Sequence, residues 1–220
     1  MPCWTCSALI FDLDGVLVDS NDTSERHWEL WAERHGVDYS RIEAIHFGRP
    51  TVEVVRLVAP HLDAVNEANE KEDTEADDTS GITPFPGASR LMTAIPPRHW
   101  GIVTSGKRRT ATIRLNHCGL PIPDMFITAN DITRGKPDPE PYQKAIDRLG
   151  IPADQCVVIE DAPAGIRSAR SAGAKVIGVT TTNPPSALNE ANAIIRHLND
   201  LQLSVVENRL QLSWDETAEY

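Results

Sequence analysis

The sequence lacks long apolar runs, and no stretch of its 220 residues approaches the roughly 20 apolar residues that a membrane-spanning helix needs. Its first six residues also lack the basic region and apolar segment that mark a secretory signal. Positive charge is scarce, since 21 Lys and Arg stand against 32 Asp and Glu for a net charge of −11. Nucleic acids and anionic membranes are bound through basic surfaces, which this excess of acid disfavours. We therefore expect a cytoplasmic protein with no nucleic-acid partner and no membrane partner.

Cysteine is scarce too, because four cysteines in a chain of this length do not make a disulfide framework. The single Cys-x-x-Cys pair, Cys3 and Cys6, has no second pair at zinc-finger spacing, and we interpret this segment as a frayed terminus. The seven histidines contain no His-Glu-x-x-His motif, which disfavours a zinc hydrolase. With 40% apolar and 24% charged residues, the composition is that of a soluble globular protein.

What the sequence does contain is a series of short apolar runs separated by helical patterns. The runs have the length of strands buried on both faces and lie at residues 7–13, 101–104, 125–128, 156–159 and 175–179. The clearest helical pattern spans residues 138–150, with Pro139 in its first turn and Gly150 as its stop. Buried strands that alternate with helices predict an α/β fold, with a doubly wound, Rossmann-like parallel sheet as its core.

One interval breaks this alternation, because residues 20–81 show helical patterns and no strand run. Residues 22–36 and 51–59 carry apolar residues at helical spacing, and we expect Asp22 and Glu25 to cap the first of these helices. Residues 66–78 hold seven acidic residues and one lysine, a run that is typical of a solvated face. We predict an all-α cap, or lid, domain at residues 20–81, inserted into a core formed by residues 1–19 and 82–220.

The residues that finish the predicted strands are polar and chemically related. Asp12 and Asp14 follow the first strand, Thr104 to Gly106 follow the second, and Glu160 and Asp161 end the fourth, with Lys136 before an intervening helix. Ligands of parallel sheets bind beyond these carboxyl ends. Carboxylates suit Mg²⁺, whereas lysine and hydroxyl groups suit phosphoryl oxygens. Each piece alone could be a turn, a surface loop or a helix cap, but their joint occurrence predicts a phosphate site with Mg²⁺.

These segments resemble the four motifs of the haloacid dehalogenase superfamily, and the resemblance extends from residue 8 to residue 179. The motifs read FDLDGVLVDS at residues 11–20, VTSG at 103–106, GKPDP at 135–139 and IEDA at 159–162. A finer resemblance, to the glycerol-phosphate and 2-deoxyglucose-6-phosphate phosphatases, rests on ERHW at 25–28, FGRPT at 47–51, FITAND at 126–131 and GKPDPEPY at 135–142.

The resemblance implies a catalytic role for both aspartates of the first motif. Asp12 would attack phosphorus to form an aspartyl-phosphate, and Asp14 would protonate the leaving oxygen and later deprotonate the hydrolytic water. Asp12 and Asp161 would hold Mg²⁺, with the Asp14 backbone carbonyl and Glu160 completing or supporting the shell. Asp14 also argues for phosphoryl transfer, because relatives that dehalogenate carbon need no general acid at that position.

The same resemblance implies a set of phosphate-binding groups. Thr104 and the backbone N–H groups of Ser105 and Gly106, at a helix start, would bind phosphoryl oxygens. Lys136 would offset the repulsion between Asp12 and the phosphate dianion.

For substrate selection, the resemblance places Gly48, Arg49 and Thr51 over the pocket. The sequence departs from the phosphatase pattern here, since Phe47 stands where histidine is expected and Pro50 where a basic residue is frequent. Alternatively, Arg49 is a surface arginine that does not contact the substrate. The stripe of aromatic residues from position 28 to 35 suggests packing within the lid, and the three basic residues at 107–109 suggest a solvated helix face.

We therefore expect a Mg²⁺-dependent phosphatase that acts on a small sugar or polyol phosphate, as a monomer or weak homodimer. A β-phosphoglucomutase-like phosphosugar mutase would share the same core residues and remains the alternative enzyme. A catalytically idle binding or scaffold protein on this fold would be expected to carry damaged motifs, whereas all four motifs are intact.

Overall fold

The computed structural model describes residues 2–46 and 49–214, and its centre is a parallel sheet. In the described residues this sheet has six strands in the order β6-β5-β2-β7-β8-β9, and all neighbouring pairs are parallel. The strands are β2 (Ala8–Phe11), β5 (Trp100–Val103), β6 (Met125–Ile127), β7 (Cys156–Glu160), β8 (Lys175–Val179) and β9 (Ala193–Ile195). Five of them match the predicted runs to within a few residues, whereas the edge strand β9 was not predicted.

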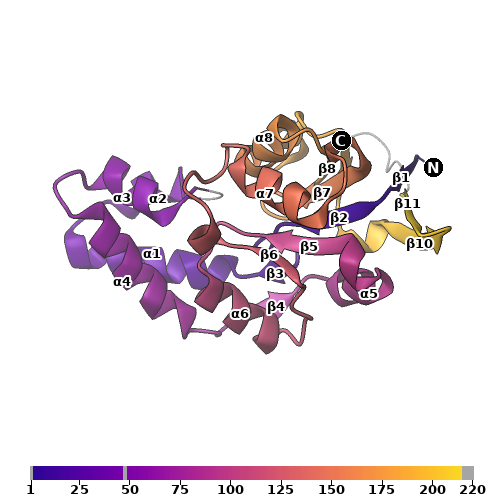
Figure 1. Cartoon of the computed structure of the whole chain (residues 1–220). Coiled ribbons are helices and arrows are strands. Elements are labelled where there is room, and N and C mark those ends of the chain that lie inside the picture. The colour runs from indigo at the N-terminus through magenta and orange to yellow at the C-terminus, as the bar shows by residue number, and fades with distance from the viewer. Residues whose placement is uncertain (1, 47–48, 215–220) are drawn as a thin grey trace.

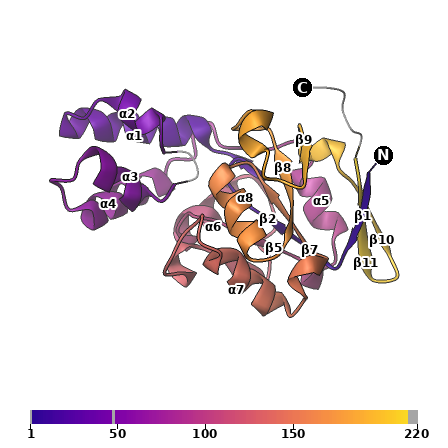
Figure 2. The same cartoon turned by 90° about the horizontal axis from the view of Figure 1, so that it is seen from above.

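Helices cover both faces of this sheet, as the doubly wound prediction requires (Figure 2). They are α5 (Ala88–Ala94), α6 (Arg108–His117), α7 (Glu140–Leu149) and α8 (Pro163–Ser171). Side chains alternate along β2, so Leu9 and Phe11 pack with α5 and α6, whereas Ala8 and Ile10 pack with α7 and α8. The two buried clusters confirm the predicted α/β fold class. Short 3₁₀ helices occur at Pro97–His99, Ala129–Asp131, Ala153–Gln155, Pro185–Leu188 and Leu198–Asp200.

A separate group of helices lies at one end of the molecule, between β3 (Val18–Asp19) and β4 (Thr83–Pro84), which pair with each other (Figures 1 and 2). We call α1 (Asn21–His35), α2 (Tyr39–Glu43), α3 (Thr51–Val58) and α4 (Ala64–Ala76) the helical unit. It has its own hydrophobic cluster, which includes Trp28, Trp31 and Val54. The expected capping pair is wrong, because α1 begins at Asn21 and its N-cap, Ser20, makes no side-chain capping bond.

The acidic segment at residues 66–78 is not simply the solvated face that its charge predicts. Within α4, Lys71 and Glu75 are buried and contact each other. Glu75 also accepts a 2.5 Å hydrogen bond from Arg114 of α6. The prediction is wrong for this side of α4, because the basic side chains of α6 cover it.

The N-terminal segment is also ordered rather than frayed. β1 (Cys3–Cys6) pairs antiparallel with β11 (Arg209–Ser213), which pairs in turn with β10 (Gln202–Val206). Trp4 packs edge-on against Trp214 with ring centroids 5.0 Å apart, and Cys6 is buried. This small sheet lies at the end of the molecule opposite the helical unit (Figure 2).

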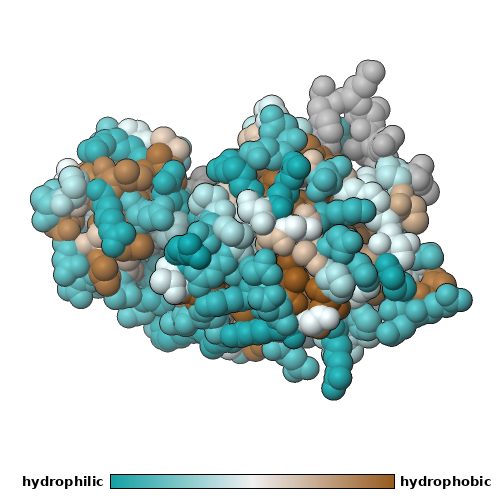
Figure 3. Space-filling view, turned by 45° about the horizontal axis from the view of Figure 1, so that its top comes forward, coloured by the Kyte–Doolittle hydropathy of each residue, from teal (hydrophilic) through white to brown (hydrophobic). Residues whose placement is uncertain are grey.

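Hydrophilic side chains predominate on the face shown in Figure 3, where hydrophobic residues form scattered patches. None of the helices in the described part of the chain is both long and apolar enough to cross a membrane.

Candidate active site

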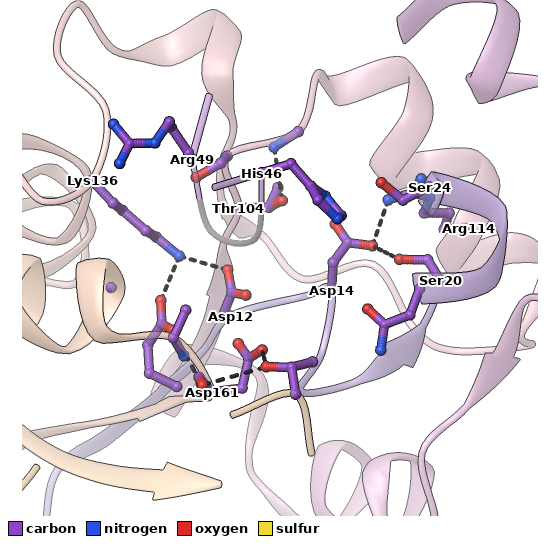
Figure 4. Close-up of a pocket in the computed structure, with 17 residues that line it drawn as sticks. Asp12, Asp14, Ser20, Ser24, His46, Arg49, Thr104, Arg114, Lys136 and Asp161 are labelled. Atoms are coloured by element: carbon purple, nitrogen blue, oxygen red, sulfur yellow. Dashed lines mark hydrogen bonds and ion pairs between the residues drawn. The ribbon is translucent and has the colours of Figure 1, made fainter. Parts of the chain in front are cut away.

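A pocket of about 150 Å³ lies at the carboxyl ends of the parallel strands, and residues near the helical unit contribute to its lining (Figure 4). Asp12 and Asp14 reach it from the end of β2, Thr104 from β5 and Asp161 from β7. The backbone N–H of Asp12 donates to the carbonyl of Ile159, so the chain continues the sheet pairing up to the first aspartate. The structure therefore brings together residues that lie up to 149 positions apart in the sequence.

Lys136 occupies the floor of this pocket as a buried cation between two carboxylates. Its Nζ lies 2.6 Å from Asp12 Oδ1 and 2.6 Å from Glu160 Oε1. Burial lowers the pKa of Lys136, but the two carboxylates raise it by more, so its pKa lies above the ordinary value and the side chain stays charged. The structure thus pairs the predicted lysine directly with the predicted nucleophile.

Glu160 is held by hydrogen bonds on both of its oxygens. Oε1 accepts from Lys136 and from the hydroxyl of Tyr142 at 2.8 Å, while Oε2 accepts from the backbone N–H groups of Asp161 and Ala162. Gly165 leaves room for this carboxylate, since a Cβ there would lie 1.7 Å from Oε1. Because both of its oxygens already accept hydrogen bonds, Glu160 is held in place and orients Lys136.

Three buried carboxylates form a candidate cation site. Single oxygen atoms of Asp12, Glu160 and Asp161 lie within 4.8 Å of one another. Burial, partly offset by Lys136, holds the pKa of Asp12 well above its usual range. Burial and the nearby Glu160 raise the pKa of Asp161 to about 7. Hard oxygen donors whose ionised forms repel one another fit a divalent cation, which would offset that repulsion.

The turn after β5 supplies hydroxyl and backbone donors to the same pocket. Thr104 is buried, with its N–H bonded to Ile127 and its Oγ1 accepting from the N–H of Gly106 at 3.0 Å. Ser105 and Gly106 line the pocket beside it, directly before α6. Thr104 faces the same pocket as Asp12 and Asp14 (Figure 4).

Asp14 points away from the three-carboxylate cluster. Its Oδ1 accepts hydrogen bonds from the Ser20 hydroxyl at 2.8 Å and from Arg114 Nη1 at 2.6 Å. The carboxylate is therefore not one of the grouped cation donors. The sequence predicted neither of these partners. Arg114 lies inside a helix outside every motif, and Ser20 is only the last residue of the first motif.

The helical unit contributes Arg49 to the pocket, together with Asn21, Ser24 and His46, which were not predicted. Thr51 lines an adjoining cavity of about 120 Å³ rather than the pocket itself. Gly48, the third predicted contact from this unit, and Phe47 lie outside the described residues.

Several residues that the sequence left between a functional and a structural role have structural partners. His27 lies 3.0 Å from Asp78, at the end of the helical unit. Trp28 and Trp31 belong to the hydrophobic cluster of the helical unit, as the packing interpretation predicts. Arg108 and Arg109, at the start of α6, are exposed as the solvated-face prediction requires, and they form surface ion pairs with Asp131 and Asp77. Lys107, just before them, is half-buried and pairs with Glu72 and Asp73.

Comparison with known proteins agrees with this geometry. The family model described as haloacid dehalogenase-like hydrolase matches residues 9–179. Hexitol phosphatase A of Escherichia coli (strain K12) is 37% identical over 211 residues, covering 92% of this chain and 96% of that protein. Glycerol-1-phosphate phosphohydrolase 2 of Saccharomyces cerevisiae (strain ATCC 204508 / S288c) is 34% identical over 189 residues, covering 80% of this chain and 75% of that protein.

Among solved structures, β-phosphoglucomutase from Clostridium difficile superimposes with a TM-score of 0.76 at 27% identity, covering 90% of this chain and 93% of that one. The similarity thus extends over the helical unit as well as the sheet. On the strength of the family match over residues 9–179 and of these relatives, the chain belongs to the haloacid dehalogenase-like hydrolases.

Proposed function

We propose that this chain is a Mg²⁺-dependent phosphatase that hydrolyses a small sugar or polyol phosphate monoester through an aspartyl-phosphate on Asp12. The observation that carries the proposal is the Asp12 carboxylate, fixed through Oδ1 by Lys136 at 2.6 Å and facing a pocket lined by Thr104 and Asp14. The similarity to a hexitol phosphatase and a glycerol-1-phosphate phosphohydrolase supports this substrate class.

In the first half of the proposed reaction, an oxygen of Asp12 forms a bond to phosphorus while the bond from phosphorus to the ester oxygen breaks. Asp14 gives its proton to that leaving oxygen, so the product departs as a neutral alcohol. In the second half, a water oxygen attacks phosphorus and releases the Asp12 carboxylate. Asp14 takes the proton of that water, which returns the site to its starting state with one inorganic phosphate formed.

Phosphoryl oxygens are bound, in this proposal, by the Thr104 hydroxyl, the backbone N–H groups of Ser105 and Gly106, and Lys136. Asp12 and Asp161 would hold Mg²⁺ through carboxylate oxygens, together with the backbone carbonyl of Asp14. The cation, when bound, neutralises charge on the transferring phosphoryl group. Glu160, whose oxygens are taken up by hydrogen bonds, supports this shell through Lys136.

We also propose that residues 20–81 are a cap domain over a core of residues 1–19 and 82–220. The separate hydrophobic cluster of the helical unit supports this division. Arg49, Thr51 and Gly48 of the cap would then face the alcohol part of the substrate, where differences between substrates lie. A small phosphorylated metabolite is the proposed partner, for a cytoplasmic monomer or weak homodimer.

A phosphate-release screen over sugar and polyol phosphates with Mg²⁺ tests this function. We expect inorganic phosphate from at least one hexitol, hexose or glycerol phosphate, and none when Asp12→Asn replaces the unaltered chain. Parallel analysis of the organic product separates the mutase alternative. Quantitative isomerisation with negligible phosphate release would overturn the proposal, and so would full activity of Asp12→Asn.

A further inference from the structure

A buried arginine joins the proposed general acid to the cap. Arg114 lies in α6 of the core, and its side chain is only 7% exposed. Its Nη1 donates to Asp14 Oδ1 at 2.6 Å, and its Nη2 donates to Glu75 Oε1 of α4 at 2.5 Å. The Arg114 guanidinium therefore connects Asp14, which follows β2, with Glu75 of the cap.

This bridge continues into the cap through a second buried cation. Glu75 is also paired with Lys71, one helical turn earlier, and Lys71 Nζ lies 4.5 Å from the ring centroid of Trp28 in α1. Burial lowers the pKa of Arg114, but Asp14 and Glu75 raise it by more, so its pKa lies above the ordinary value and the guanidinium stays charged. Losing one partner of such a network leaves an uncompensated buried charge, so its members hold one another in place.

The two oxygens of Asp14 have different surroundings. Oδ1 accepts from both Ser20 and Arg114. Oδ2 faces the turn after β5, which holds Thr104 to Gly106, since a Cβ built on Gly106 would lie 4.0 Å from this oxygen. An oxygen that already accepts two hydrogen bonds is a poor place for a proton. Arg114 therefore selects Oδ2 as the oxygen that carries and delivers the proton.

We propose that Arg114 is a positioning residue that aims the Asp14 proton at the leaving oxygen, and that Glu75 of the cap holds Arg114 for this task. The inference rests on the proposed function, because it assigns Arg114 and Glu75 to the acid step of that reaction. Neither residue belongs to the four motifs, and among the described residues no hydrogen bond or ion pair joins either of them to Asp12 or Asp161.

The test compares two phosphate esters that differ in their need for a general acid. A hexitol phosphate has a poor, alkoxide leaving group, whereas p-nitrophenyl phosphate has a good one that departs without a proton. The value of kcat/KM reports the steps up to phosphoryl transfer, before Asp14 acts as a base. We expect Glu75→Gln and Arg114→Gln to lower kcat/KM for the hexitol ester by about tenfold or more, but for the aryl ester by less than about threefold.

Matched variants complete the experiment. Glu70→Gln, on the exposed side of the same helix in an ion pair with Arg34, should leave both esters unchanged. Arg114→Lys retains the charge but offers one nitrogen for two carboxylates, and we expect it to restore part of the loss on the hexitol ester. Thermal unfolding of every variant identifies those that are folded.

The outcomes separate this inference from the proposed function. A selective loss on the hexitol ester supports it. Equal losses of kcat/KM on both esters would overturn it. Failure of Glu75→Gln, Arg114→Gln and Arg114→Lys to fold would also overturn it, because the network would then be structural only. Absence of turnover by the unaltered chain on both esters would instead overturn the proposed function, and this inference with it.

Discussion

At the scale of single residues, Gly15 shows how closely the backbone approaches the carboxylates of the proposed active site. Gly15 has a φ of 85°, and a Cβ at this position would lie 2.2 Å from Asp161 Oδ2. The side chain of any other residue would therefore displace Asp161, in addition to the strain of a left-handed backbone. This glycine lets the turn that carries Asp14 lie directly against the end of β7.

Gly15→Ala should therefore impair the site more than the fold. We expect a loss of stability of about 1–2 kcal/mol from backbone strain, measured by denaturant unfolding, and at least a tenfold loss of phosphate release. Gly150→Ala is the matched control, because Gly150 has a φ of 65° with no atom within 4 Å of a built Cβ. It should show similar strain with activity retained, and equal activity losses in both variants would contradict this account.

His46 predicts a pH dependence of stability. Burial, with a further contribution from Lys71, lowers the pKa of His46 from 6.5 to about 4. Between these values the unfolded chain binds a proton that the folded chain does not, so this contribution to stability is present above pH 6.5 and is lost as the pH falls to 4. We expect a loss of about 1–3 kcal/mol over this window. In denaturant titrations, His46→Gln should flatten that dependence, and an unchanged slope would contradict it.

Residues of the site differ in how far sequence could predict them. Asp12, Thr104 and Asp161 could be placed together because each follows a buried parallel strand, and such strands end at one edge of the sheet. Arg114 and Glu75 could not, because a basic residue inside a helix and one acid among seven carry no local signal. Their pairing depends on how α4 docks against α6, which is decided by tertiary packing.

At the scale of elements, the buried strands were predictable and the small antiparallel sheet was missed. Most side chains of β10 are exposed and those of β11 alternate between buried and partly exposed, so neither strand has a continuous apolar run. A signal was nevertheless present: Leu210 and Leu212 alternate with polar residues, and Glu207 and Asn208 form a two-residue turn with positive φ. β1 is recognisable only through its partner, since nothing near residue 6 indicates pairing with residue 210.

This sheet should contribute measurably to stability. Trp214 is buried and packs on Trp4, so Trp214→Ala should lower the free energy of unfolding by about 3–5 kcal/mol. Val206→Ala, at an exposed position of the same sheet, should change it by less than about 0.5 kcal/mol. Thermal or denaturant unfolding measures both variants. A small effect of Trp214→Ala would mean that the terminal sheet is not part of the cooperative fold.

At the scale of the whole molecule, the net charge of −11 is distributed among three different environments. Some acids surround the proposed cation site, several on α4 are neutralised across its contact with α6, and others are exposed. Under the proposed function, an acidic chain can bind a phosphate ester because Lys136 and a bound cation would make the pocket locally attractive. Formal charge alone disfavours nucleic-acid and anionic-membrane partners, but it does not predict the chemistry of the site.

Cation binding should stabilise the whole chain. At a Mg²⁺ concentration about a hundredfold above its dissociation constant, we expect about 2.7 kcal/mol of added stability over the protein in EDTA. Asp161→Asn should abolish this gain by removing a buried carboxylate from the cluster. Asp124→Asn, at an exposed position, should keep it. An undiminished Mg²⁺ effect on Asp161→Asn, measured by scanning calorimetry, would contradict the proposed site.

Transfer of the phosphoryl group to Asp12 can be observed by acid-quench trapping of the protein during turnover. A hexitol phosphate labelled in its phosphoryl group is mixed with the unaltered chain and Mg²⁺ and is quenched in acid within the first turnover. We expect a labelled protein whose peptide map places the phosphoryl group on Asp12, and we expect Asp12→Asn to retain no label. Turnover without any protein-bound label, or label retained by Asp12→Asn, would contradict this transfer.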